Sequence, residues 1–155
     1  MSEIQHIRGF FKSVCVGPAW HGPSLAENLK DVTAQAAAAH PIPGGHSIWE
    51  IVNHVSTWEH EVAKYLQGKP YVTLTGEDDW PPVKDTSEEA WQKTLADLEA
   101  GHKALSAAMQ AFPETKLHET IPGCDFSWYG LMHGMPHHSL YHSGQIAILK
   151  RAAAA

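Results

Sequence analysis

Apolar residues recur along much of the chain at intervals of three and four, the period of helices that bury one face. The first such run predicts a helix over about 2–16 and consists of Ile4, Ile7, Phe10, Phe11 and Val14. The sequences SLAE and SIWE are typical of capping boxes, and they predict a short helix over about 24–39 and a long one over about 47–67. The sequence TSEE predicts a further helix over about 86–112, and the last helix is expected within 127–151.

The segment over 68–85 connects two of the expected long helices and contains several prolines and glycines. Fully extended at roughly 3.3 Å per residue, it spans about 60 Å, whereas a helix of roughly 20 residues is about 30 Å long. The connection is therefore long enough to cross the bundle, so the two flanking helices can run parallel. We predict an all-α fold, a four-helix bundle with one long crossover connection and one short extra helix, in a single domain over 1–155. Pro136 is expected to kink or split the last helix, because it lacks a backbone N–H donor.

The apolar face of the last helix contains polar residues that need partners. It has spacings of four and three and consists of Leu131, Met135, His138, His142, Gln145 and Leu149. Two imidazoles and an amide are costly to bury unless something binds them. His138 and His142 are four residues apart, so both rings can reach one metal ion from a single face of the helix. His133 and His137 have the same spacing but fall outside this face.

A third metal ligand has to come from another helix, and the helix over 47–67 offers His54. The apolar face of that helix consists of Ile48, Ile51, Val52, Val55, Trp58, Val62 and Leu66. At about 100° per residue, His54 lies beside this face, whereas His60 lies roughly opposite and is expected to contact solvent. Each histidine is also compatible with a polar residue that hydrogen-bonds within the bundle.

Two stretches of the chain together resemble the DinB/YfiT-like superfamily. The stretch HSIWEIVNHVSTWEHEV contains a W-E-x-x-x-H motif at Trp49, Glu50 and His54. The stretch HHSLYHSGQIAILKR contains an H-x-x-x-H-x-G-Q motif at His138, His142, Gly144 and Gln145. The resemblance follows the chain in helix order, and it implies a four-helix bundle that holds a divalent metal on His54, His138 and His142. It also implies a homodimer formed through faces of the bundle.

Three imidazoles leave open positions on a divalent metal, as in catalytic rather than structural sites. Zn²⁺, Ni²⁺ and Fe²⁺ all suit imidazole. An open position that takes water indicates a hydrolase, and one that takes a low-molecular-weight thiol indicates a thiol-dependent S-transferase or isomerase. The resemblance implies thiol-dependent activities of this kind. Gln145 and Glu50 are candidates for groups that orient the ligands, although Glu50 also fits a capping box and Gln145 a bridge between helices.

Composition and charge narrow the class of protein. The chain has a net charge of −6 and no basic run, which argues against nucleic-acid binding. No apolar stretch approaches the roughly 20 residues of a membrane span, and the charged first residues are not typical of a signal peptide. Cys15 and Cys124 have no spacing motif, so we expect both to be reduced. These observations favour a cytoplasmic protein that acts on a small-molecule substrate.

Two alternatives to an enzyme follow from the same residues. The first is a non-catalytic metal- or ligand-binding bundle, either a sensor or a sequestering module. The second is a purely structural bundle whose buried polar residues satisfy one another. Four aromatic residues either line a pocket beside the metal or belong to the core, namely Trp49, Trp58, Trp128 and Tyr141. Seven further histidines are expected on the surface, at positions 6, 21, 40, 102, 118, 133 and 137, while His46 precedes the cap of the helix over 47–67.

Overall fold

The computed structural model describes residues 2–153, and this part of the chain is helical with no β-strand. The bundle has four long helices, α1 (Glu3–Cys15), α4 (Ile48–Leu66), α5 (Glu88–Ala111) and α6 (Trp128–Ala153). Between α1 and α4 lie two short helices, α2 (Leu25–Leu29) and α3 (Ala34–Ala38). Single turns of 3₁₀ helix lie at Gly76–Asp78 and Glu114–Lys116. The predicted all-α fold is confirmed.

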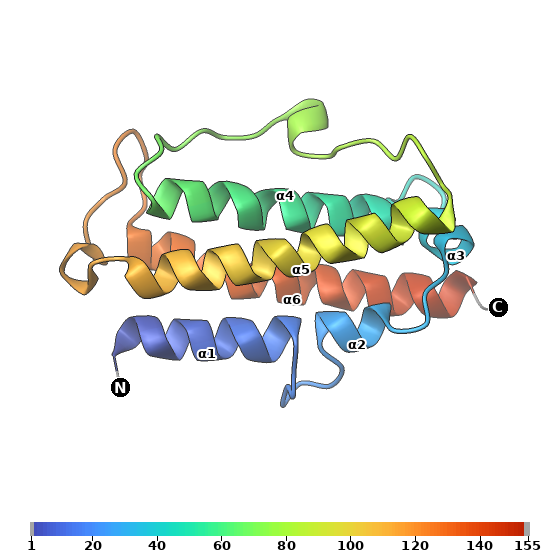
Figure 1. Ribbon diagram of the computed structural model, residues 1–155, viewed down its shortest axis with the longest axis horizontal. Helices are drawn as coiled ribbons and strands as arrows, with labels where there is room; N and C mark the ends of the chain where they lie inside the picture. Colours follow the sequence, from blue (N-terminus) through green and yellow to red (C-terminus); the bar gives the residue numbers. More distant parts are fainter. Residues whose placement is uncertain (1, 154–155) are drawn as a thin grey trace.

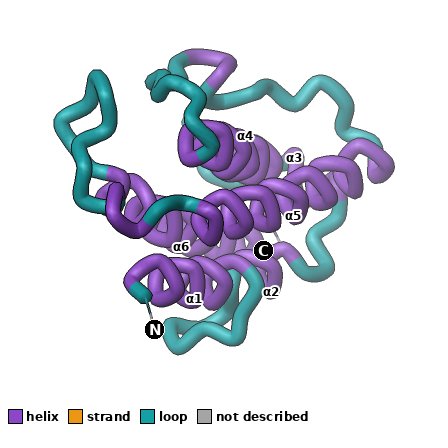
Figure 2. Tube along the Cα trace, turned by 60° about the vertical axis from the view of Figure 1, so that its left-hand side comes forward, coloured by secondary structure: helices purple, strands orange, loops and turns teal. Residues whose placement is uncertain are grey.

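The crossover segment, residues 68–85, sets the direction of the helices. It leaves the C-terminal end of α4, runs along the outside of that helix and reaches the far end of the molecule, where α5 begins (Figure 1). Helices α4 and α5 therefore run parallel, and α1 and α6 run in the opposite direction. Figure 2 shows the four long helices packed side by side, with the crossover segment outside them.

Side-chain caps determine where the long helices begin. The Ser47 hydroxyl accepts from the Glu50 N–H at 3.2 Å, and Glu50 Oε2 accepts from the Ser47 N–H at 2.8 Å, so the predicted capping box opens α4. The prediction for α5 is wrong by one residue, because its cap is Ser87 and not Thr86. The Ser87 hydroxyl accepts from the Ala90 N–H at 3.2 Å, which satisfies a donor in the first turn of the helix.

The single short helix predicted over 24–39 is wrong, because the structure has two helices here, α2 and α3. Asp31 lies between them with a φ of 63°, in the left-handed region. Trp91 of α5 donates from Nε1 to the backbone oxygen of Val32 at 2.7 Å. A tertiary hydrogen bond thus satisfies a carbonyl group that the bend leaves outside a helix.

Helix α6 continues through Pro136, so the predicted split does not occur. Its buried side chains are Met132, Met135, Pro136, Ser139, His142, Ser143, Ile146 and Leu149. This face contacts α1, α2 and α4, and such tertiary packing stabilises a helix more than local propensity does. Packing therefore compensates for the hydrogen bond that the proline cannot make.

The interior consists of two apolar clusters separated by polar residues. One cluster joins α1 to the second halves of α4 and α5 and the first half of α6. The other joins α2 and α3 to the first halves of α4 and α5 and the end of α6. Between them lies a polar layer that contains His54, Ser56, Glu59, Ser139, His142 and Ser143, all buried. Buried polar groups need bonding partners, and this layer contributes residues to both groups of ligand-type side chains described below.

Candidate metal centre

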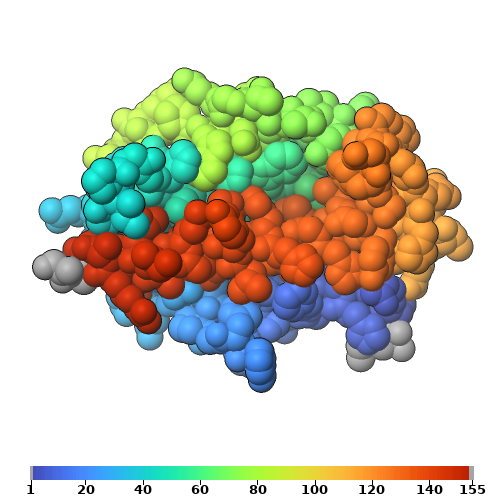
Figure 3. Space-filling model, turned by 180° about the vertical axis from the view of Figure 1, so that it is seen from behind, coloured from blue at the N-terminus to red at the C-terminus, as the bar shows by residue number. Residues whose placement is uncertain are grey.

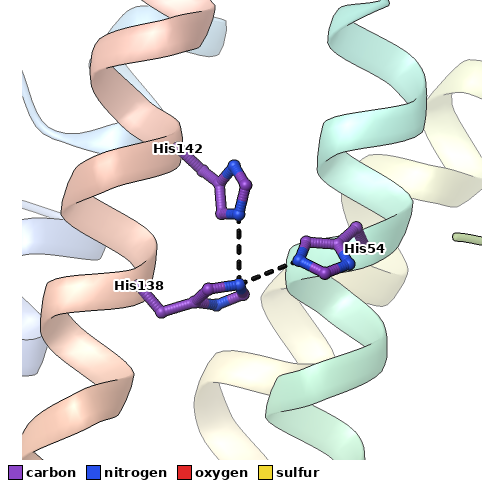
Figure 4. A group of neighbouring side chains, drawn as sticks. All are labelled: His54, His138 and His142. Atoms are coloured by element: carbon purple, nitrogen blue, oxygen red, sulfur yellow. Dashed lines mark hydrogen bonds between the residues drawn. The ribbon is translucent and has the colours of Figure 1, made fainter. Parts of the chain in front are cut away.

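The three histidines predicted as ligands meet between α4 and α6. His138 Nε2 lies 2.9 Å from His54 Nε2 and 3.1 Å from His142 Nε2. Figure 4 shows the His54 ring extending from α4 toward the two rings of α6. One donor nitrogen from each ring lies within 4.8 Å of the other two. The structure therefore brings all three side chains to a common point, where one ion can contact them.

Asp79 orients the His54 ring. His54 Nδ1 lies 2.8 Å from the backbone oxygen of Asp79 and 3.1 Å from its carboxylate Oδ1. Both of these oxygens are acceptors, so Nδ1 carries the proton and Nε2 keeps its lone pair. That lone pair faces His138. Metal-ligating histidines are typically held in this way, by an acceptor on the second ring nitrogen.

Gln145 orients the His142 ring in the same sense. His142 Nδ1 lies 2.6 Å from Gln145 Oε1, and Gln145 Nε2 donates to the Tyr141 hydroxyl at 3.3 Å. With the amide oxygen toward the ring, His142 Nδ1 is the donor and Nε2 has a free lone pair. Gln145 therefore contacts a candidate ligand on its own helix, as required of an orienting group.

His138 completes the group without an orienting partner of its own. Its Nδ1 atom is buried and has no hydrogen-bond partner within residues 2–153. Its Nε2 atom faces the lone pairs of both His54 and His142, and a single proton there serves two acceptors poorly. A cation bound by all three Nε2 atoms would satisfy each of them. The donor set therefore fits a divalent ion that prefers imidazole, such as Zn²⁺, Ni²⁺ or Fe²⁺.

Burial keeps the three imidazoles neutral. Desolvation, with a smaller contribution from His142 and His54, lowers the pKa of His138 from 6.5 to about 3. Desolvation likewise lowers the pKa of His142 to about 4, against the opposing effect of its hydrogen bond to Gln145. The pKa of His54 is also lowered, chiefly by desolvation, while the contacts with Asp79 oppose the shift. Near pH 7 all three rings are therefore in the form that binds metals.

Asp79 belongs to the crossover segment, and no pattern in the sequence selects it as a site residue. Two side chains of α4 fix this part of the segment. Trp58 Nε1 donates to Asp79 Oδ1 at 2.7 Å, and Asn53 Nδ2 donates to the backbone oxygen of Pro81 at 3.3 Å. The segment is thereby held against α4 at the level of His54, which explains how a long connection can place an acceptor on a ligand.

Trp80 is the second residue of the site that the sequence did not predict. Its ring stacks on His54, with centroids 3.9 Å apart and planes 7° apart. On the other side it stacks on His46, with centroids 3.7 Å apart and planes 5° apart. These contacts fix the plane of the His54 ring and cover one of its faces. The signal in the sequence is DDWPP, an aromatic residue in a stiff stretch of a long connection.

Other residues considered from the sequence lie elsewhere. Glu50 caps α4 through Ser47 and lies 3.0 Å from His40 Nε2, and no contact with a ligand histidine is found within the described residues. His133 and His137 do not converge, because their ring centroids are 6.4 Å apart. The capping role of Glu50 is therefore the correct one of its two alternatives.

Two histidines expected to contact solvent, His60 and His102, differ in their exposure. The His60 side chain is 32% exposed and lies 3.2 Å from the carboxylate of Asp97. The surface position predicted for His102 is wrong, because its side chain is 12% exposed and contacts the buried carboxylate of Glu59. Helix α5 thus contributes a further, largely buried imidazole next to Glu59 of the polar layer.

The four aromatic residues considered as pocket-lining divide between core and site. Trp49 is buried and donates from Nε1 to Thr94 Oγ1 at 2.9 Å, and Trp128 packs against the apolar cluster around α1. Trp58 bonds to Asp79 as described. Tyr141 is 65% exposed and carries the hydroxyl that accepts from Gln145. The aromatic residue that directly covers a ligand is Trp80, as described above.

A small groove of about 280 Å³ lies beside Gln145, and none of the three histidines lines it. It is lined mainly by aliphatic groups and consists of Ile42, Gly45, His46, Ile51, Gln145, Ile148 and Leu149. Gln145 contacts His142, and His46 stacks on Trp80, so the groove shares two residues with the surroundings of the site. Figure 3 shows the face of the molecule on which α6 is exposed. Helix α6 (orange to red) runs across the middle, with the crossover segment above it and helices α1 and α2 below it.

Within the described chain, none of the helices combines the length and the apolar character needed to cross a membrane. Comparisons with curated proteins and with solved structures give no significant match. The family model of the DinB superfamily, in contrast, matches residues 21–146. This range covers most of the chain and includes all three histidines. The fold, the position of the histidines and this match agree, and the chain belongs to the DinB superfamily.

Proposed function

We propose that the chain is a metal-dependent enzyme acting on a small organic substrate, with a divalent ion held by His54, His138 and His142. The observation that supports this proposal is the convergence of three Nε2 atoms, two of which have their lone pairs directed inward by acceptors on Nδ1. The superfamily is metal-binding. Zn²⁺, Ni²⁺ and Fe²⁺ are the ions that such a ligand set suits.

The charge of the site favours chemistry with an anionic ligand. Three neutral imidazoles leave the charge of a divalent ion uncompensated, so an added anion is bound favourably. When bound, the divalent metal ion would lower the pKa of a coordinated water or thiol and so supply a nucleophile at neutral pH. Water corresponds to a hydrolase, and a low-molecular-weight thiol to a thiol-dependent S-transferase or isomerase.

The residues around the site have separate tasks in this proposal. Asp79 and Gln145 hold the Nδ1 protons of His54 and His142, which keeps both Nε2 atoms available. Trp80 keeps the His54 ring in its plane and excludes water from one face. The aliphatic groove beside Gln145, about 280 Å³ in volume, would take the apolar part of a small substrate.

Turnover assays on metal-reconstituted protein test the proposal. Protein without an affinity tag is stripped with a chelator, reloaded with Zn²⁺, Ni²⁺ or Fe²⁺, and offered small esters, amides and electrophiles with and without a thiol. Turnover without thiol supports the hydrolase, and turnover only with thiol supports the transferase. Tight metal binding without turnover by any ion would instead indicate a sensor or a sequestering module.

Matched variants show whether the three histidines are responsible. His142→Ala removes one ligand and is expected to abolish metal-dependent turnover, because two imidazoles hold a divalent ion weakly. His137→Ala changes an exposed histidine of the same helix and is expected to retain it. Equal loss in both variants, or none in either, would contradict the assignment of the site.

A further inference from the structure

A second group of ligand-type side chains lies in the polar layer, apart from the three histidines. Cys15 at the end of α1, Glu59 of α4 and His102 of α5 each place a donor atom within 4.8 Å of the other two. Cys15 and Glu59 are 0% exposed, and the His102 side chain is 12% exposed. Three different helices thus bring a thiol, a carboxyl group and an imidazole to one buried point.

Glu59 is unusual because its carboxylate is buried with little to compensate its charge. Oε2 contacts His102 Nδ1, and Oε1 accepts from Ser139 Oγ over a long distance of 3.4 Å. Within residues 2–153, no lysine or arginine forms an ion pair with this carboxylate. Burial raises the pKa of Glu59, against the effect of His102. A buried carboxyl group normally requires a charged or strongly donating partner.

The backbone of α5 makes room for this carboxylate. Gly101 precedes His102, and a Cβ atom at this position would lie 3.2 Å from Glu59 Oε2 and 3.3 Å from Glu59 Cβ. Any other residue here would press on the carboxylate. The glycine therefore allows α4 and α5 to approach closely enough for Glu59 and His102 to meet.

We propose that Cys15, Glu59 and His102 form a second divalent-metal site, distinct from the three-histidine centre and suited to a thiophilic ion such as Zn²⁺. Thiolate, carboxylate and imidazole are all ordinary zinc ligands. Binding displaces the thiol proton of Cys15, and the Glu59 proton where it is present, to solvent. The neutral His102 ring keeps its single proton on the nitrogen that does not face the ion. Ser139 Oγ, which already contacts Glu59, is the nearest further oxygen donor on α6.

Charge balance distinguishes this site from the three-histidine centre. One thiolate and one carboxylate together neutralise a divalent ion, so the complex is neutral and can remain buried without a counter-ion. The three-histidine centre has no anionic ligand of its own and therefore favours an added one. We infer that the second site has a structural role, joining α1, α4 and α5.

A catalytic use of the same thiol is disfavoured. Burial and the nearby Glu59 carboxylate raise the pKa of the Cys15 thiol well above its ordinary value. Without a metal the thiol therefore stays protonated, and the protonated form is a poor nucleophile. Coordination to a metal changes this, because a coordinating thiol is deprotonated.

Solvent can approach the second site between α1 and α5. A groove of about 520 Å³ between these helices is lined in part by Cys15 and His102. Arg8 and Lys12 line the same groove, and their positive charge opposes the entry of a cation. We therefore expect this site to fill more slowly than the three-histidine centre, and long incubation is part of its test.

Cobalt provides a direct readout, because Co²⁺ bound to a thiolate has a strong near-ultraviolet charge-transfer absorption that three imidazoles do not produce. Metal-free, tag-free protein is incubated with Co²⁺ under a phosphine reductant. We expect two equivalents of metal per chain and a thiolate band whose amplitude corresponds to one bound cobalt ion per chain. One equivalent without the band would overturn the proposal, whatever the result of the turnover assays.

Variants identify the thiol and separate the two sites. Cys15→Ser should lose the band and one equivalent, whereas Cys124→Ser, which changes the other cysteine, should retain both. His54→Ala should lose one equivalent and keep the band. If Cys15→Ser does not fold, His102→Asn provides the same test by losing one equivalent. A band that disappears in Cys124→Ser, or persists in Cys15→Ser, would also overturn the proposal.

Discussion

Gln145 fixes the proton position of His142, and this contact can be removed without changing a ligand. In Gln145→Leu the His142 ring loses the acceptor that lies 2.6 Å from Nδ1. We expect metal affinity to fall by about 10–100-fold, the usual cost of losing an orienting partner. Competition with a chromogenic chelator measures this. Tyr141→Phe removes only the hydroxyl beyond Gln145 and serves as the control, and an equal loss in both variants would contradict the orienting role.

The buried histidines His138 and His142 also make the stability of the metal-free protein depend on pH. The pKa values of His138 and His142 fall from 6.5 to about 3 and about 4 in the folded state. Between pH 6.5 and the lowered pKa values, the unfolded chain binds more protons than the folded chain. The stability present above pH 6.5 is therefore lost as the pH falls toward 4. Each histidine contributes a slope of at most about 1.4 kcal/mol per pH unit.

Denaturant unfolding with a chelator present, at several pH values, measures this slope. His138→Gln should flatten it, while His137→Gln should leave it unchanged. Glu59 acts in the opposite direction, because its raised pKa makes protonation favour the folded state as the pH falls. Both His138→Gln and His137→Gln keep Glu59, so the difference between their slopes does not contain the contribution of Glu59. An unchanged slope in His138→Gln would show that this ring is not buried in neutral form.

At the scale of elements, the crossover segment depends on Trp80, which stacks between His46 and His54. Trp80→Leu should lower the free energy of unfolding by about 0.5–1.5 kcal/mol for each stacked ring. Metal affinity should fall as well, because His54 loses the ring that fixes its plane. Urea unfolding and chelator competition measure the two effects. Trp20→Leu is the matched control, since Trp20 is 100% exposed, and an equal response would contradict the stacking role.

Helices that carry their own signals could be predicted closely from the sequence. The helix predicted over 47–67 is α4 (Ile48–Leu66), because both the capping box at Ser47 and the apolar face lie within the segment. The three candidate ligands could be selected for a related reason. His138 and His142 share one helical face, and His54 borders the apolar face of α4. Local periodicity therefore contained most of the information about the site.

Features that depend on distant partners could not be predicted in this way. The bend between α2 and α3 is held by Trp91, which donates to Val32 O, and by Lys150, which donates to Lys30 O at 2.5 Å. Neither donor is near the bend in the sequence. Asp79 could not be predicted either. The crossover segment has no periodic pattern, so its sequence does not show which of its residues lies beside His54 on α4. Long-range hydrogen bonds account for these errors.

For the molecule as a whole, we propose a homodimer. Large apolar side chains are exposed on the bundle, including Ile148 at 60% and Val72 at 57%. Exposed apolar groups of this size favour association when they form a patch. Light scattering coupled to size-exclusion chromatography should give twice the mass of the 17.0 kDa chain. A monomeric mass across the accessible concentration range would contradict the dimer.

Metal binding should stabilise the whole bundle, because His54 lies on α4 and the other two ligands lie on α6. An ion present at roughly 100 times its dissociation constant stabilises the folded state by about 2.7 kcal/mol. For a domain of this size, 1 kcal/mol corresponds to about 2–4 °C in melting temperature. We therefore expect Zn²⁺ at the three-histidine centre to raise Tm by about 5–11 °C at neutral pH relative to chelator-treated protein, and any further rise reports the site at Cys15.

Two variants divide this stabilisation between the proposed sites. In His54→Ala only the site at Cys15 remains, so any remaining difference between zinc and chelator reports that site. In the double variant His54→Ala and Cys15→Ser the difference should disappear, because neither site keeps its ligand set. Differential scanning calorimetry with and without chelator measures each step. A wild-type Tm that is the same with zinc and with chelator would show that neither group of side chains binds the ion tightly in the folded chain, since a ligand that binds only the folded state must raise its melting temperature.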